Sequence, residues 1–196
     1  MSKIPSFLVS FPRSGQHMTQ RLLREFHQKK NLSYSYCEFY NCCNQTPCKL
    51  NKIYQKSHDF DLKITPCKSK KHIFLYRKDK IEQLEAWFRM FHPTPDYSKI
   101  ETYQKLLSFY KSKSLYYDRM IKKYSRKKSN ILPIEYNKFL KEPENILYII
   151  LSFFDIKTTR KEVKEFLNNR KEKISKRHTL NQQLKNRLKK DLKLQI

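Results

Sequence analysis

The stretch FLVSFPRSGQH (residues 7–17) contains Gly15, the only glycine in this chain of 196 residues. An apolar run precedes the glycine, and Met18 to Lys29 has the residue spacing of an amphipathic helix. Because glycine takes a positive φ angle without steric cost, a single glycine between a strand and a helix predicts a tight loop. The free N–H groups at the start of the helix, together with Arg13, predict that this loop binds an anion.

Strand-like and helical segments alternate along most of the chain. The expected strands are Ser6–Ser10, Lys52–Gln55, His72–Tyr76 and Asn130–Ile134. The expected helices are Met18–Lys29, Lys80–Phe91, Ile100–Tyr124, Pro143–Phe154, Arg160–Asn169 and Asn181–Leu194. This alternation predicts a three-layer α/β fold, with a central parallel β-sheet flanked by helices and a P-loop-like phosphate-binding loop after the first strand.

The domain organisation is expected to be simple. The chain shows no internal repeat and no linker, so residues 1–196 are expected to form a single domain. Within it we expect a cysteine-rich loop at residues 31–50 and a helical C-terminal extension at residues 157–196.

The composition fits a folded protein with an unusually basic surface. Hydrophobic residues make up 38% of the chain and aromatic residues 14%, which is enough to fill a core and excludes disorder of the whole chain. The formal net charge of +25 favours a polyanionic partner. Lysine is abundant together with asparagine, isoleucine and tyrosine, as an A+T-rich coding sequence would also produce. A solvated lysine-rich surface and a charge-driven interaction therefore both stay open.

The apolar segments indicate a soluble protein. None approaches the length of a membrane span, and residues 1–5 do not begin a signal peptide, so we expect a cytoplasmic protein with no transmembrane segment. The last helix carries leucines at intervals of four, which predict either a docking face on its own domain or a membrane or partner surface; docking is the favoured interpretation. These leucines are Leu180, Leu184, Leu188 and Leu192.

Four of the five cysteines, Cys37, Cys42, Cys43 and Cys48, fall within twelve residues, and the fifth is Cys67. Their spacing is not the paired CxxC of a typical zinc site. Reduced thiols in or near a loop are the favoured interpretation, followed by disulfides and then by a structural metal. The odd number leaves at least one thiol outside any intrachain disulfide.

Three segments combine into a chemical hypothesis. The Gly15 loop lacks the second glycine, the lysine and the serine or threonine of a nucleotide triphosphatase loop, so Mg-ATP fits it poorly. His58 and Lys56 follow another strand, and Asp59 is close enough in sequence to orient His58. Arg77 ends a third strand. If these strands are parallel, an imidazole and several cations meet at one sheet edge, which suggests a ligand with phosphates at both ends.

In this order the segments resemble motifs of another enzyme class. FPRSG (residues 11–15), KSH (56–58) and YRKDK (76–80) are similar to the 5′-phosphosulfate loop, the Lys-Thr/Ser-His segment and the 3′-phosphate motif of sulfotransferases that use 3′-phosphoadenosine 5′-phosphosulfate (PAPS). LPIEYNKFLKEP (132–143) resembles a further segment of these enzymes. The resemblance spans roughly residues 6–156. Each motif alone is weak, and the specific signal is that all of them occur in the same order as in these enzymes.

The resemblance implies a role for each matching residue. Arg13 and the amides at Ser14, Gly15, Gln16 and His17 would hold the 5′-phosphosulfate, and Arg77 would hold the 3′-phosphate. His58 would act as general base on an acceptor hydroxyl, with Lys56 and Arg13 stabilising the bridging oxygen as 3′,5′-adenosine bisphosphate leaves. Thr19 is a further candidate phosphate contact, and Tyr136 is a candidate adenine-side contact. No metal is expected to be required.

The sequence also departs from the family pattern. Gln16-His17 stands in place of Thr-Thr, so hydroxyl contacts to the phosphate are left to Ser14 or Thr19. Glu85 stands where a serine usually helps to hold the 3′-phosphate, and a carboxylate there would repel it. The closing Arg-Lys-Gly segment is absent, with Arg170-Lys171 or Lys176-Arg177 as candidate substitutes.

The sequence does not identify the acceptor. The cysteine-rich segment (34–48) and the aromatic region at 87–103 are expected to line its side of the site. A sugar, a lipid hydroxyl, a phenol and a peptide tyrosine are all compatible, and the short chain favours carbohydrate. The alternative to an enzyme is a basic nucleic-acid or polyanion-binding module in which the Gly15 loop grips a backbone phosphate; a small-molecule kinase is a third hypothesis. The enzyme interpretation expects no nucleic-acid partner.

Overall fold

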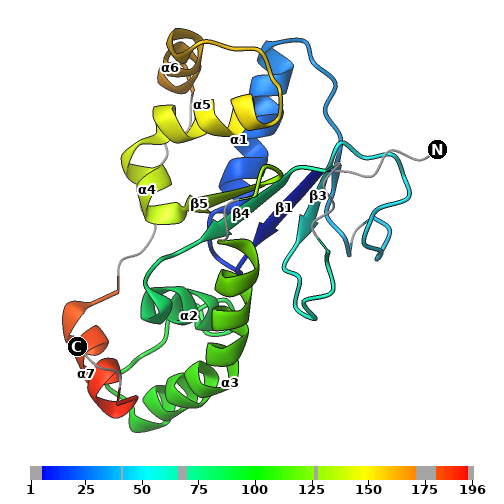
Figure 1. The fold of residues 1–196 in the computed structure, drawn as a ribbon. Coiled ribbons are helices and arrows are strands. Elements are labelled where there is room, and N and C mark those ends of the chain that lie inside the picture. The colour runs from blue at the N-terminus through cyan, green and yellow to red at the C-terminus, as the bar shows by residue number, and fades with distance from the viewer. Residues whose placement is uncertain (1–5, 41, 66–69, 126–127, 171–179, 194–196) are drawn as a thin grey trace.

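The computed structural model describes residues 6–40, 42–65, 70–125, 128–170 and 180–193 (Figure 1). Its centre is a five-stranded sheet in the order β2-β3-β1-β4-β5, in which every pairing is parallel. The strands are β1 (Ser6–Ser10), β2 (Tyr36–Cys37), β3 (Tyr54–Ser57), β4 (His72–Tyr76) and β5 (Ile131–Glu135). The predicted α/β fold with a parallel sheet is confirmed.

Helices cover both faces of the sheet. They are α1 (Gln16–Lys29), α2 (Lys80–Phe88), α3 (Ile100–Tyr124), α4 (Tyr136–Lys141), α5 (Pro143–Phe153), α6 (Arg160–Asn168) and α7 (Gln182–Asp191). One apolar core lies against α2, α3 and α7, and a second lies against α1, α4, α5 and α6. Figure 1 shows these two groups of helices on opposite sides of the strands.

The central strand β1 supplies both cores because successive side chains of a strand point to opposite faces. Phe7 and Val9 belong to the core beneath α2 and α3, whereas Leu8 belongs to the core beneath α1 and α5. The edge strand β5 contains Pro133, which lacks the N–H that an interior strand would need for its second neighbour.

Several observed boundaries differ from the predicted ones. The strand expected at Lys52–Gln55 is β3, Tyr54–Ser57, because its register with β1 pairs Ser6 with Tyr54 and Val9 with Ser57. Backbone hydrogen bonds to β1 extend β3 over the polar residues Lys56 and Ser57, which a pattern based on hydrophobicity would not include. The two-residue β2 lies inside the segment expected to be a loop, and α4 was not predicted. Both are too short to show the hydrophobic periodicity of a strand or a helix.

The C-terminal helix α7 docks on its own domain, as the leucine spacing predicted. Leu188 is 1% exposed, and Leu180, Leu184 and Leu192 pack against the same core. Lys185 on α7 pairs with Asp79, the N-cap of α2, and with Glu82 in the first turn of α2. These ion pairs reinforce the apolar contact between the two helices.

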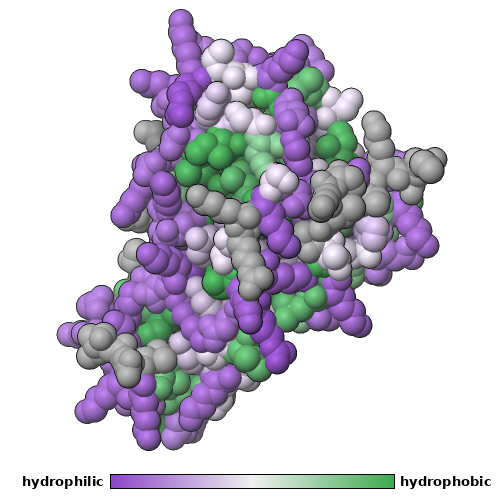
Figure 2. All heavy atoms as spheres, viewed as in Figure 1, coloured by the Kyte–Doolittle hydropathy of each residue, from purple (hydrophilic) through white to green (hydrophobic). Residues whose placement is uncertain are grey.

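The rest of the visible surface is mainly polar. Hydrophilic side chains cover much of the face shown in Figure 2, with smaller hydrophobic patches between them. Among the described residues, no helix has both the length and the apolar character needed to cross a bilayer.

The connections at the carboxyl ends of β1 and β4 run to opposite faces of the sheet. After β1 the chain enters α1, which packs in one core, and after β4 it enters α2, which packs in the other. In open parallel sheets, ligands bind where neighbouring strands send their connections to opposite faces. The loops carrying Arg13 and Arg77 lie at this switch point.

Candidate functional site

The loop after β1 depends on glycine for two reasons. Gly15 is the N-cap of α1 with φ +85°, a left-handed conformation that costs other residues energy. The ring of Tyr136 lies directly on it: a Cβ at this position would lie 2.4 Å from two ring carbons. Arg13 in the same loop also has a positive φ, +66°. The loop is therefore tightly turned and closely packed.

Gln83 on α2 holds the loop to the neighbouring strand end. Its side-chain carbonyl accepts hydrogen bonds from Ser14 Oγ at 2.5 Å and from the Arg77 backbone N–H at 3.3 Å. Its amide nitrogen donates to the Pro12 carbonyl at 2.9 Å. Since Gln83 is fully buried, these bonds join the loops after β1 and β4 without competition from water.

Three predicted phosphate contacts have side chains that are engaged within the protein. The Ser14 hydroxyl donates to Gln83, and the Thr19 hydroxyl donates to the Gly15 carbonyl at 3.1 Å. The Gln16 amide points inward and donates to the Leu8 carbonyl at 2.5 Å. The main-chain N–H groups of Ser14 and Thr19 are engaged as well, with the carbonyls of Phe11 at 3.2 Å and Gly15 at 2.9 Å. The donors suited to an anion are therefore the main-chain N–H groups of the first helical residues, from Gln16 onward.

Arg77 lies beside this loop. Its side chain is buried, with 8% of the residue exposed, and its Nη2 donates to the Arg13 carbonyl at a long 3.5 Å. The buried Nε has no hydrogen-bond partner among the described residues. The guanidinium carbon lies 4.8 Å from the centre of the Tyr136 ring. Burial lowers the pKa of Arg77, and the nearby Arg13 lowers it further. A buried cation with an unused donor suits an anionic ligand.

His58 directly follows β3 and points at the end of β1. Its Nδ1 lies 2.8 Å from the Ser10 carbonyl, which accepts only from a protonated nitrogen. This contact places the proton of neutral His58 on Nδ1 and leaves the Nε2 lone pair available as a base. Burial lowers the pKa of His58 below its ordinary value, and the positive charge of Lys56 lowers it further. The imidazole is thus held neutral and oriented.

Asp59 does not orient His58, so that expectation was wrong. The carboxylate is 4% exposed and accepts from Lys123 Nζ at 2.5 Å, from the Tyr124 hydroxyl at 2.7 Å and from the Ile64 N–H at 2.9 Å. It anchors α3 beneath the loop. The orientation of His58 comes from the Ser10 carbonyl instead, because this acceptor lies on the adjacent strand of the sheet.

The remaining cations lie close to these groups. Lys56 Nζ is 3.4 Å from a carboxylate oxygen of Glu38. His17 is exposed at the start of α1; burial of part of its ring lowers its pKa, and Lys56 and Arg13 lower it further. The electrostatic influence of Lys56 on both histidines places all three side chains in one neighbourhood. The structure therefore brings Arg13, His17, Lys56, His58 and Arg77 to one sheet edge.

The structure also places Tyr136, the candidate adenine-side contact, and Glu85, which departs from the family pattern. Tyr136 is 8% exposed and packs between Gly15 and Arg77, so its ring supports the loop. Glu85 is 1% exposed and accepts from the Tyr97 hydroxyl at 2.7 Å, with Arg89 at 3.8 Å. These contacts offset part of the negative charge that Glu85 brings near Arg77.

The candidate substitutes for the closing segment are only partly described. Arg170 Nε donates to Glu25 on α1 at 2.7 Å, so this arginine is tied to the helix. Lys171, Lys176 and Arg177 lie outside the described residues, as does Cys67.

Aromatic rings border the histidine. The Phe60 ring is centred 5.2 Å from His58 and stacks on Trp87 at 5.7 Å. Phe60 is 49% exposed, so it offers an apolar face to a ligand beside the base.

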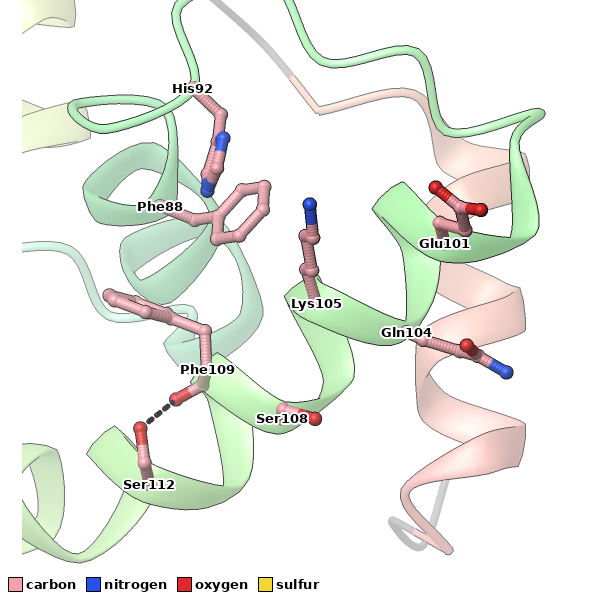
Figure 3. Close-up of a pocket in the computed structure, with 8 residues that line it drawn as sticks. All are labelled: Phe88, His92, Glu101, Gln104, Lys105, Ser108, Phe109 and Ser112. Carbon is pink, nitrogen blue, oxygen red and sulfur yellow. Dashed lines mark hydrogen bonds between the residues drawn. The ribbon is translucent and has the colours of Figure 1, made fainter.

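A separate hollow of about 670 Å³ lies between the end of α2 and the first half of α3 (Figure 3). It is lined by Phe88, His92, Glu101, Gln104, Lys105, Ser108, Phe109 and Ser112. Phe88, His92 and Glu101 belong to the 87–103 region that was expected to line the acceptor side, but no residue of this hollow is a predicted catalytic or phosphate contact. The chemistry-bearing cluster at the strand ends is the better candidate.

Sequence reasoning missed the residues that hold the site together. Gln83 carries no motif; its only signal is a polar residue among apolar helix positions. Tyr116 donates to the His58 carbonyl, and Tyr117 donates to the Arg77 carbonyl at 2.8 Å. No spacing in the sequence relates these α3 tyrosines to the loops that they bind.

Comparisons with known proteins give little further guidance. No protein-family model and no curated protein matches the chain. The chain is similar to a solved structure described as a sulfotransferase domain from the curacin biosynthetic pathway, with 13% sequence identity, 100% of both chains covered and a TM-score of 0.44. A likeness this distant does not indicate a function for this chain.

Proposed function

We propose that this chain is a sulfotransferase that moves a sulfuryl group from PAPS to a hydroxyl acceptor. The observation that carries the proposal is the convergence of Arg13, Arg77 and His58 at the switch point of the sheet. Arg77 offers a buried, unpartnered Nε beside the Arg13 carbonyl, and His58 offers a free Nε2 from the neighbouring strand end. The ordered resemblance of the surrounding segments to sulfotransferase motifs points to the same chemistry.

The residues present fit a bisphosphorylated nucleotide. The N–H groups at the start of α1 and the side chain of Arg13 suit a 5′-phosphosulfate. Arg77 suits a second phosphate because its buried Nε has no hydrogen-bond partner among the described residues. The side chains of Ser14, Gln16 and Thr19 and the main-chain N–H groups of Ser14 and Thr19 are engaged within the protein, so of these three positions we assign only the Gln16 N–H to the donor.

The donor, when bound, supplies an activated sulfuryl group and a bisphosphate leaving group. His58 accepts the proton of the acceptor hydroxyl on Nε2, while its Nδ1–H stays on the Ser10 carbonyl. Lys56 and Arg13 stabilise negative charge as it develops on the donor side. No step in this scheme requires a metal. Positioning and electrostatics supply most of the rate in such loose transfers.

The acceptor side is aromatic. Phe60 lies against His58 and stacks on Trp87, so an acceptor hydroxyl near Nε2 would have its carbon skeleton beside an exposed ring. A carbohydrate suits this arrangement, because the C–H face of a sugar packs on an aromatic ring while its hydroxyls stay polar.

A thermal-shift assay tests donor binding. We expect 3′,5′-adenosine bisphosphate to raise Tm without magnesium, by an amount that corresponds to about 2.7 kcal/mol at a ligand concentration of one hundred times Kd. Arg77→Met should lose the advantage of this ligand over adenosine 5′-monophosphate, which lacks the 3′-phosphate. Arg119→Met, an exposed arginine on α3, is the matched control and should respond like the parent protein.

Three outcomes would overturn the proposal. The first is no response to the bisphosphate. The second is magnesium-dependent stabilisation by ATP, which would indicate a kinase. The third is salt-sensitive binding to many nucleic acids without a nucleotide response, which would indicate a polyanion-binding module.

An activity assay tests the chemistry. With labelled donor and a panel of glycans, lipids and phenols, we expect transfer to a hydroxyl and a loss of about 10²–10⁴-fold in His58→Gln. Unchanged transfer in this variant would remove His58 from the mechanism.

A further inference from the structure

Four cysteine side chains gather beside the sheet, at the end of β2. The sulfur atoms of Cys37, Cys42, Cys43 and Cys48 all lie within 4.8 Å of one another. Cys37 and Cys43 are the pair separated by 3.5 Å. Cys37 and Cys48 are buried, and the other two are partly exposed. The linear spacing lacks a CxxC pair, but the turns of the loop bring all four sulfurs to one point.

This mutual closeness matches a tetrahedral metal site. A zinc ion with four Zn–S bonds of about 2.3 Å separates its sulfurs by about 3.8 Å. Disulfide pairing needs sulfurs close in pairs and makes no demand on the distances between the pairs. Here each sulfur is near the other three, which is the arrangement that a single ion at the centre requires.

The segment around these cysteines has little else to fix it. The described residues of 38–53 form no helix or strand and contribute no side chain to either apolar core. The buried Gln55 on β3 attaches the segment to the sheet: it accepts from the Cys48 N–H at 2.8 Å and donates to the Gln45 carbonyl at 2.6 Å. A bound ion can supply folding free energy where a segment has no core of its own.

We propose that Cys37, Cys42, Cys43 and Cys48 bind one structural Zn²⁺ as four thiolates. Each thiol releases its proton to solvent as its Zn–S bond forms, and no oxidation or reduction is involved. The site is closed, because four protein ligands complete the tetrahedron and leave no open position for substrate. The inference does not depend on the proposed function.

The ion would also hold a residue that contacts the candidate site. Glu38 follows Cys37 directly and pairs with Lys56 at 3.4 Å. Holding Cys37 therefore restrains the backbone that carries the carboxylate partner of Lys56. The expected role of zinc is to hold the segment beside Lys56, outside the reaction itself.

Metal analysis of the full chain tests the site. Protein purified under reducing conditions should contain one zinc per chain by mass spectrometry of the metal. Replacement by Co²⁺ should give the intense visible bands and the sulfur-to-cobalt charge-transfer bands of a tetrahedral thiolate site. Cys48→Ser should lose these bands, whereas Cys67→Ser, the matched control at the fifth cysteine, should keep them.

A second measurement covers the case in which Cys48→Ser fails to fold. The parent protein, stripped with a chelator, should show a lower Tm and recover it when Zn²⁺ alone is added. The proposal is overturned if the reduced parent protein carries no zinc and its Tm responds to neither treatment. It is also overturned if the four cysteines are found in disulfides, or if Cys67→Ser abolishes the cobalt bands.

Discussion

Substitution of Gly15 by alanine tests the packing of the loop against Tyr136. The added Cβ meets two obstacles: the left-handed backbone at φ +85° and the ring carbons 2.4 Å away. The first costs about 1–2 kcal/mol, and overpacking of a buried contact costs about 1–3 kcal/mol. We therefore expect Gly15→Ala to lower the free energy of unfolding by about 2–5 kcal/mol, a large part of the stability of an ordinary domain.

A double-mutant cycle separates the two costs. In a Tyr136→Ala background the ring is gone, so Gly15→Ala should cost only the backbone part, about 1–2 kcal/mol. Urea denaturation of the four proteins measures the cycle, provided that the m-value stays constant. Asn31→Gly is the reverse control for the backbone part: Asn31 is exposed with φ +51°, so removal of its Cβ should relieve this cost. Equal costs of Gly15→Ala in both backgrounds would refute the close approach of the ring.

Three further predictions concern the imidazole, the loop and the α1–α6 contact. His58 should titrate below its ordinary pKa of about 6.5 in NMR spectra. Lys56→Met should raise the pKa of His58, because a repelling positive charge is removed. An unchanged pKa in this variant would contradict the closeness of Lys56 to His58. Gln83→Ala should lower the free energy of unfolding by about 2–4 kcal/mol, because its buried partners lose their hydrogen bonds. The control Gln104→Ala, at an exposed position, should change it by no more than about 0.5 kcal/mol. Chemical denaturation measures both, and equal effects would show that Gln83 does not link the two loops. The hydrogen bond from Lys30 lowers the pKa of Glu162 from 4.5 to about 2. The stability that this Lys30–Glu162 pair contributes is therefore complete above pH 4.5 and is lost as the pH falls toward 2. NMR of the Glu162 carboxyl should show the low pKa, and an ordinary pKa would exclude the pair in solution.

Much of the architecture follows from local features of the sequence. The apolar run of β1, the single glycine after it and the helical spacing of α1 predict a strand, a tight turn and a helix, because each depends on neighbouring residues. The alternation of such units predicts the parallel sheet. The same reasoning places Arg13, His58 and Arg77 at strand ends, and parallel strands bring their ends to one edge.

Contacts between distant residues could not be predicted in this way. Asp59 is next to His58 in sequence, yet it binds Lys123 and Tyr124 on α3. Gln83 carries no motif, yet it joins the two loops. Such partners are chosen by how helices pack on the sheet, and no local pattern records that packing.

The sequence by itself predicted four of the five strands of the described sheet, the glycine turn and the set of charged residues at the strand ends. Only the tertiary structure decided that the Ser10 carbonyl fixes the His58 tautomer, that Tyr136 closes on Gly15 and that four cysteines with unpromising spacing meet at one point. The physical reason is the range of the interactions: backbone preference and periodicity act over a few residues, whereas hydrogen-bond partners and possible metal ligands are selected across the folded chain.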